Sequence, residues 1–172
     1  MLDSSHSAAT TIARWRTASE SGDAEAALAC LSPDIVLASP LTDQFRLEGT
    51  DQLRDFLTAA FTAVEDIRFH TETGQGDTYA LVYRARVASQ PFEEAQVLRL
   101  DDQARIREIT LFGRPMPALT ALMITLGPKL ARQQGRQGLA ALLRVSATPI
   151  HAMVTSGDRR IVPRTRPAAR RT

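Results

Sequence analysis

The chain has 172 residues, of which 44% are hydrophobic and 23% are charged, a composition typical of one soluble globular domain with or without an appendage. Its single cysteine, Cys30, excludes an internal disulfide and fits a reducing compartment, so we expect a cytoplasmic protein. The first residues lack the basic and apolar regions of a secretion signal, and no uncharged apolar stretch reaches the roughly 20 residues of a membrane span.

The net charge of +2 is the sum of two unlike segments. Residues 1–128 contain 11 arginines and 18 acidic residues, a balance of −7. Residues 129–172 contain ten basic residues and one acidic residue, Asp158, a balance of +9. This asymmetry predicts that the C-terminal segment either has its own partner or docks on the acidic body.

Three helices are predicted before residue 65, with one short strand between the second and the third. Apolar residues recur at helical spacing, as Ile12 and Trp15 do in the first helix. Asp23 and Thr50 are typical N-cap residues, and Gly22 is a typical C-terminal stop. The expected ranges are 8–20, 24–31 and 51–64 for the helices and 35–38 for the strand.

Four strands are predicted after residue 66. Each run alternates apolar and polar side chains or is bounded by turn residues, such as Gly74 and Asp101. The expected ranges are 67–71, 79–88, 94–100 and 106–112. Helices followed by an antiparallel sheet predict an α+β fold.

Alternation also assigns faces to the strands. In the strand 79–88, Leu81 and Tyr83 belong to an apolar face and Arg84 and Arg86 to the opposite one. The apolar face is therefore predicted to point inward.

The last two strands carry polar residues on faces that are otherwise apolar. Gln96 shares its face with leucines. In the final strand, alternation from Ile106 places Glu108, Thr110 and Phe112 on one face. Because both faces of this strand are partly apolar, we expect one to line a pocket and the other to contact another chain or the C-terminal segment.

The order and spacing of several features resemble one family of proteins. These features are a helical start, Ser39-Pro40, Gly49, a helix at 53–61 and a final strand at 105–112. Over residues 8–115 the chain resembles the nuclear transport factor 2-like superfamily, in its SnoaL-like and ketosteroid-isomerase-like branch. The resemblance implies a cone-shaped, curved antiparallel sheet wrapped around N-terminal helices, with one deep pocket. We assign residues 1–116 to this domain.

The resemblance also implies where catalytic groups would stand. Isomerases of this family carry a carboxylate just before the proline after the first strand, where this chain has Ser39. They carry a protonated acid on a middle strand, where register gives Gln96, a residue that still donates a hydrogen bond. Related epoxide hydrolases and cyclases use an aspartate on the last strand, where this chain has Thr110. These neutral residues argue against the isomerase reaction, because a serine of ordinary pKa is a poor general base.

Two carboxylates remain as candidate catalytic groups. Glu108, on the predicted pocket face, is either a desolvated acid with a raised pKa or the partner of Arg84, Arg99 or Arg114 at the rim of the cone. Asp43, in the loop near the mouth of the cone, either replaces the missing base or forms a turn. The predicted ligand-binding residues are Trp15, Ser39, Phe56, Tyr83, Gln96, Thr110 and Phe112.

Residues 117–155 are predicted to form a helical extension outside the resemblance. Pro117 suits a first helical position, and the apolar residues from Leu119 to Leu130 leave almost no polar face, so this helix is expected to be buried. It either packs on the cone or across its mouth, joins two chains, or acts as a lid. Residues 156–172 are predicted to form a disordered, basic tail.

We predict that the pocket binds a small apolar or polycyclic molecule, with isomerase, cyclase or hydrolase chemistry as the accompanying activity. The alternative is a non-catalytic dimeric scaffold or interaction module whose C-terminal helices and arginine-rich tail bind a protein partner or an anionic membrane. A homodimer is expected, and residues 117–172 suit peripheral membrane contact.

Cofactors and nucleic acids are not expected. Histidine and cysteine have no metal-ligand spacing, and no phosphate-binding glycine loop, nucleophile elbow or dinucleotide fingerprint occurs. The tail has no interleaved aromatic residues, which argues against sequence-specific binding of nucleic acid.

Overall fold

The computed structural model describes residues 2–167, which contain five α-helices, six β-strands and one short 3-10 helix. The helices are α1 (Leu2–Ser21), α2 (Ala24–Leu28), α3 (Gly49–Ala63), α4 (Met116–Gln133) and α5 (Gln137–Arg160). The strands are β1 (Leu31–Ala38), β2 (Leu47–Glu48), β3 (Val64–Gln75), β4 (Thr78–Val87), β5 (Gln90–Leu100) and β6 (Ile106–Arg114), and the 3-10 helix is η1 (Val162–Thr165). The predicted α+β class is confirmed.

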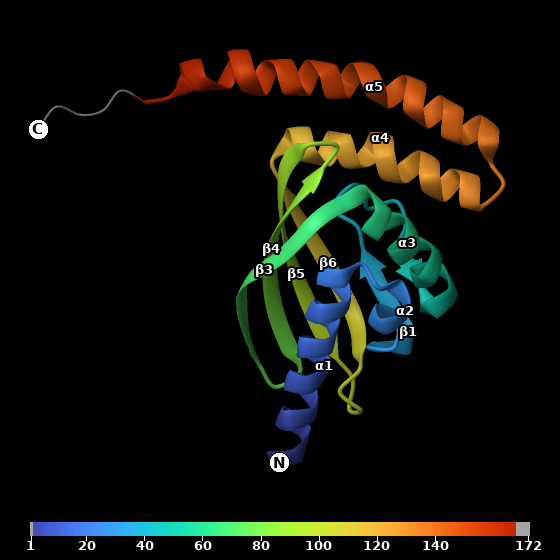
Figure 1. Cartoon of the computed structure of the whole chain (residues 1–172), viewed down its shortest axis with the longest axis vertical. Coiled ribbons are helices and arrows are strands. Elements are labelled where there is room, and N and C mark those ends of the chain that lie inside the picture. The colour runs from blue at the N-terminus through green and yellow to red at the C-terminus, as the bar shows by residue number, and fades with distance from the viewer. Residues whose placement is uncertain (1, 168–172) are drawn as a thin grey trace, which may run out of the picture.

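The strands form one curved, unclosed sheet in the order β2-β1-β6-β5-β4-β3 (Figure 1). Strands β3 to β6 follow one another as an antiparallel meander, whereas β1 pairs with β6 in parallel. Helices α1 and α3 lie on the inner side of the curve (Figure 1). The sheet and these helices make the cone that was expected from the resemblance.

Helices α1, α2 and α3 bury their apolar sides against the inner face of the sheet. Ile12 and Trp15 of α1 and Leu53 of α3 are almost completely buried in this core. Helix α1 ends at Gly22, whose φ of +71° suits glycine, and the next N–H donates to the carbonyl of Ala18 at 2.9 Å. This is the Schellman arrangement, so the predicted stop at Gly22 is confirmed.

The inner face of β4 is the one that alternation predicted. Leu81, Tyr83, Ala85 and Val87 are all buried, while the arginines between them are exposed. The contrast between the two faces of this strand is strong, so the period of two was sufficient to orient it.

The inner face of β6 differs from the predicted one. At Arg107 the pairing with β5 skips one residue, which forms a β-bulge. The bulge shifts the alternation by one position after Ile106, so Ile109 and Leu111 point inward instead. The residues that alternation had placed on the inner face lie on the outer face of β6; they are Glu108, Thr110 and Phe112.

Helices α4 and α5 form two layers over one end of the cone, the end at which β4 turns into β5 (Figure 1). Ala118, Leu122 and Leu126 of α4 belong to a second core cluster, together with residues of α3 and of β3 to β5. Helix α5 packs on the other side of α4 through small buried residues, Ala140 and Ala147. The extension therefore lies across the mouth of the cone, one of the expected placements.

The extension is helical further along the chain than predicted. Residues 156–160 belong to α5 and 162–165 to η1, whereas a disordered tail was expected from residue 156. Arg159 and Arg160 occupy the last turn of α5, where basic residues stabilise the negative end of the helix dipole. The end of the predicted tail, residues 168–172, lies outside the described residues. No described helix combines the length and hydrophobicity that crossing a membrane requires.

Candidate functional site

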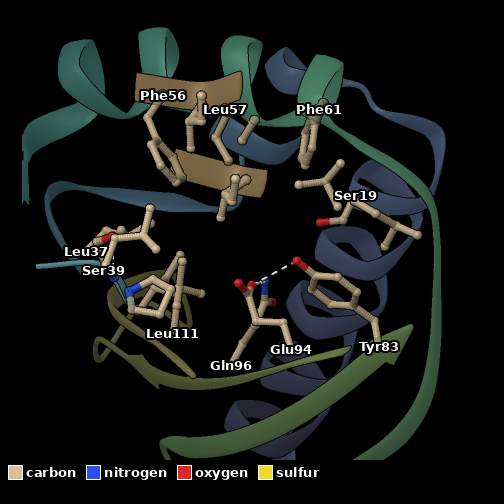
Figure 2. Close-up of a pocket in the computed structure, with 18 of the residues that line it drawn as sticks. Ser19, Leu37, Ser39, Phe56, Leu57, Phe61, Tyr83, Glu94, Gln96 and Leu111 are labelled. Atoms are coloured by element: carbon tan, nitrogen blue, oxygen red, sulfur yellow. Dashed lines mark hydrogen bonds between the residues drawn. The ribbon is translucent and has the colours of Figure 1, made fainter. Parts of the chain in front are cut away.

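A cavity lies inside the cone, between α1, α3, the inner faces of β4 to β6 and the inner side of α4 (Figure 2). Its walls are mainly apolar, and Leu122 and Leu126 of α4 contribute to them. The volume that the centre of a water-sized sphere can reach is about 60 Å³. Since one water needs about 10–15 Å³ of such volume, the space suits about five water molecules or one small organic molecule.

A chain of hydrogen bonds crosses the cavity wall. The Tyr83 hydroxyl donates to Oε1 of Glu94 at 2.8 Å, and Nε2 of Gln96 donates to the same oxygen at 3.3 Å. The indole Nε1 of Trp15 donates to Oε1 of Gln96 at 3.0 Å. Both bonds to Glu94 end on one oxygen, and among the described residues none donates to the other, Oε2. Oε2 is therefore available to a molecule in the cavity.

The register of β4 and β5 places these groups together. Tyr83 and Glu94 are directly paired across the two strands, so their side chains leave the same face as neighbours. Gln96 follows Glu94 at a spacing of two and shares that face. The Tyr83 ring is held edge-on between Phe69 and Phe92, with ring centroids at 5.3 and 6.2 Å. The hydroxyl is thereby fixed in position towards Glu94 (Figure 2).

Glu94 is the acid of this cavity, and burial changes its chemistry. Only 4% of the residue is exposed. Removal from water raises the pKa of Glu94 to about 7, although the hydrogen bonds from Tyr83 and Gln96 act in the opposite direction. Burial together with the neighbouring carboxylate raises the pKa of Tyr83 well above its ordinary value, so the phenol stays protonated. Near neutral pH, Glu94 alone of this pair changes its charge.

Ser19 of α1 adds a second polar group to the cavity. Its hydroxyl is buried, has no hydrogen-bond partner in the described structure and lines the cavity. Figure 2 shows this oxygen directed into the space that Tyr83 and Glu94 face. A buried hydroxyl without a partner is costly, which favours a polar atom of a bound molecule at this point.

A sequence profile decides the family of the chain. The profile of the SnoaL-like domain matches residues 12–109, which is more than half of the chain. The chain belongs to the SnoaL-like family. The resemblance described from residues 8–115 is thereby confirmed.

Solved structures agree with this assignment. A steroid delta-isomerase from Pseudomonas aeruginosa is 27% identical, with a TM-score of 0.64 over 75% of this chain and 92% of that chain. A cystatin-like-fold protein from Silicibacter pomeroyi is 20% identical, with a TM-score of 0.68 over 75% of this chain and 93% of that chain. The epoxide hydrolase/cyclase-like enzyme SalBIII, described for pyran ring formation in salinomycin, is 16% identical. Its TM-score is 0.56 over 66% of this chain and 95% of that chain. Comparison with curated protein sequences gives no match.

Most of the predicted ligand-binding residues do line the cavity of this SnoaL-like domain. They are Trp15, Ser39, Phe56, Tyr83 and Gln96. Of these, Gln96 and Tyr83 hydrogen-bond to the buried acid. The Ser39 hydroxyl instead accepts a hydrogen bond from the N–H of Leu41 at 3.2 Å, as turn-forming serines do.

The other predicted residues stand apart from the cavity. Phe112 is 58% exposed, and Thr110 lies beside it on the outer face of β6. Glu108 is on the same face, where its Oε2 lies 3.8 Å from Nε of Arg99, the pairing given as the alternative for this residue. Asp43 is exposed in the loop between β1 and β2 and is not among the lining residues. The geometry does not bring either predicted catalytic carboxylate to the cavity.

Glu94 is the polar residue of the cavity that sequence reasoning missed. The predicted strand began at this residue, whereas β5 begins four residues earlier, at Gln90. A signal was nevertheless present, because Glu94 has the same parity as Gln96 and therefore the same face. In this SnoaL-like domain, Glu94 lies two positions before Gln96 on β5.

Proposed function

We propose that this SnoaL-like protein binds a small, largely apolar molecule with one oxygen function in its cavity, and that Glu94 transfers a proton on it, as in isomerase or cyclase chemistry. The observation that carries the proposal is a buried carboxyl group at an apolar cavity, held by Tyr83 and Gln96 and with its Oε2 unpaired. The names of the isomerase and cyclase-like neighbours point to the same chemistry.

The acid is matched to proton transfer at neutral pH. A group whose pKa is about 7 has both protonation states populated there, so it can take a proton and return it. In the proposed step, the Glu94 carboxylate removes a proton from carbon next to a carbonyl group. The Ser19 hydroxyl donates a hydrogen bond to the carbonyl oxygen as negative charge develops on it. The proton then returns from Glu94 to the substrate.

The size of the cavity supports a small ligand. A volume of about 60 Å³ suits a molecule of about one ring, and a polycyclic molecule requires displacement of the leucines of α4. The apolar walls favour a hydrocarbon skeleton, and Ser19 and Glu94 favour one oxygen function at the sheet side. Small cyclic ketones combine these properties.

Proton transfer can be tested without the natural substrate. Cyclopentanone and cyclohexanone are incubated with the protein in D₂O, and loss of the protons next to the carbonyl is followed by NMR. We expect exchange to be faster with the protein than in buffer, and Glu94→Gln to lower this acceleration by about 100-fold or more. Glu93→Gln is the matched control, because Glu93 is adjacent in sequence but points outward to Arg84 and Arg114.

Two results would contradict the proposal. Undiminished exchange in the Glu94→Gln protein would remove Glu94 as the proton carrier. Binding is tested separately by native mass spectrometry of protein purified from its own host, before and after denaturation. A protein that carries no small molecule and accelerates exchange of neither ketone would overturn the proposed ligand class.

A further inference from the structure

The outer side of α5 carries an apolar stripe that nothing in the described structure covers. Leu142, Val145, Pro149 and Met153 recur at spacings of three and four, which places them on one side of the helix. Leu142, Val145 and Met153 are 62%, 73% and 69% exposed. The opposite side of α5 packs on α4 through Ala140 and its neighbours. We call the four residues the outer stripe.

Exposed apolar side chains are concentrated in this part of the molecule. Within the described residues, seven of the eleven large hydrophobic side chains that are exposed fall between Leu139 and Val162. Helix α5 is also the layer furthest from the tip of the cone, which is the end at the turn between β3 and β4 (Figure 1). The exposed apolar side chains are therefore gathered mainly at one end of the molecule. In most proteins, by contrast, single exposed apolar residues are scattered over the surface.

Basic residues accompany the stripe, and those in the described range form no ion pair with a carboxylate. Seven of the eleven arginines of the cone form ion pairs with carboxylates. None of the eight basic residues in the described range 129–167 forms one. Arg160 follows Met153 by seven residues and so lies on the same side of α5, and Arg159 is exposed next to it. Arg144 is exposed at the groove between α4 and α5. Positive charge at this end is therefore left for a partner outside the chain.

We propose that α5 and η1 form a docking surface for an anionic lipid bilayer. The outer stripe enters the boundary between headgroups and acyl chains, and the flanking arginines contact lipid phosphates. An apolar helical face combined with a cluster of basic residues provides the two contributions on which reversible binding at a membrane surface depends. The acidic cone, with its balance of −7, is then held away from the lipid by α4 and α5.

Two other occupants fit the surface less well. A symmetric dimer through α5 places the same patch on both chains, so the basic residues of one copy face those of the other. Single-stranded nucleic acid is bound by aromatic side chains interleaved with basic ones, and the chain has no aromatic residue after Phe112. Neither explains why apolar and basic residues coincide on an exposed helix.

The test is co-sedimentation of the full chain with large vesicles. One set is pure phosphatidylcholine, and the other contains about 30 mol % phosphatidylglycerol, an anionic lipid. We expect binding to the anionic vesicles only, weakening as salt is added. Replacing Leu142, Val145 and Met153 by serine, or Arg144, Arg159 and Arg160 by glutamine, is expected to lower the partition coefficient by about tenfold or more.

A matched control distinguishes this surface from exposed apolar residues in general. Phe45 and Phe112 are 59% and 58% exposed on the cone, and replacing both by serine is expected to leave vesicle binding unchanged. Circular dichroism confirms that each variant is folded. Equal binding to both kinds of vesicle, or retained binding in both α5 variants, would overturn the proposal. The proposal would also be overturned if the protein binds no vesicles and instead self-associates or binds nucleic acid, and if that interaction is lost when the outer stripe is replaced.

Discussion

Among single residues, Glu94 is expected to make the stability of the protein depend on pH. Its pKa in the folded protein is about 7, above the ordinary value of 4.5. Between these two pH values the unfolded chain loses the proton and the folded chain retains it, so the free energy of unfolding falls as the pH rises through this window. The loss is complete above the folded pKa.

Glu94→Gln is therefore expected to stabilise the protein at alkaline pH. One pKa unit corresponds to about 1.4 kcal/mol, so the gain in the free energy of unfolding at about pH 8 is on the order of 3 kcal/mol. The gain is expected to be much smaller at about pH 5, where Glu94 in the native protein is already protonated and uncharged, as glutamine is at every pH. Urea denaturation at the two pH values measures it.

Glu93→Gln is the control for this measurement, because its effect has the opposite sign. Hydrogen bonding to Arg114 lowers the pKa of Glu93, so its contribution to stability is present above its unfolded pKa and lost as the pH falls. We expect no stabilisation of the Glu93→Gln protein at alkaline pH. An unchanged pH dependence in the Glu94→Gln protein would show that this carboxyl group is not desolvated.

The sequence was informative about residues wherever the two faces of a strand differ in polarity. Tyr83 was oriented correctly because arginines alternate with it on β4. On β6 both faces are partly apolar, and the bulge at Arg107 is set by the pairing with β5, which alternation within one strand does not contain. Glu94 was missed because it stood at the edge of a predicted strand, where the assignment of a face is weakest.

At the scale of elements, α4 determines how the cone is closed. Its leucines complete both the second core cluster and the cavity wall. The near absence of a polar face in its sequence predicted burial, and the helix is indeed covered by the cone on one side and by α5 on the other. Which side meets the cone depends on long-range packing, so the sequence left the placement of the extension open.

Two adjacent leucine-sized residues test this docking. Leu122→Ala removes a buried side chain from the interface with the cone, and we expect it to lower the free energy of unfolding by about 2–5 kcal/mol. Met123→Ala, at a residue that is 39% exposed, is expected to cost much less. Denaturant unfolding of both variants gives the comparison. Equal losses would indicate that α4 is not seated on the cone as described.

At the scale of the whole molecule, charge and exposed apolar surface divide the protein into two ends. The tip of the cone, at the turn between β3 and β4, is opposite to α4 and α5 (Figure 1). The charge part of this division is visible in the sequence, as the balances of −7 and +9. It did not predict that the basic segment forms an outermost helical layer, because that depends on how α5 packs on α4.

Docking through α5 predicts a defined orientation on lipid. With anionic vesicles present, we expect amide hydrogen exchange to slow along α5 and to remain unchanged at the turn around Gly76. Exchange measured by mass spectrometry with neutral vesicles is the reference. Slowing confined to the turn or to the outer face of the sheet would place the lipid contact elsewhere and contradict this orientation.

The location of Tyr83 and Glu94 on one hairpin has a consequence for how such a protein diversifies. The two residues are 11 positions apart and are directly paired, so a short local segment holds the acid and its donor. Apart from Gln96 on the same hairpin, the rest of the wall comes from α1, β1 and the loop after it, α3, β3, β6 and α4, most of which are more distant in the chain. Under the proposed function, replacements in those elements would change the shape of the molecule that is accommodated, while the proposed proton carrier stays where it is. Selection can therefore alter the chemotype without rebuilding the acid.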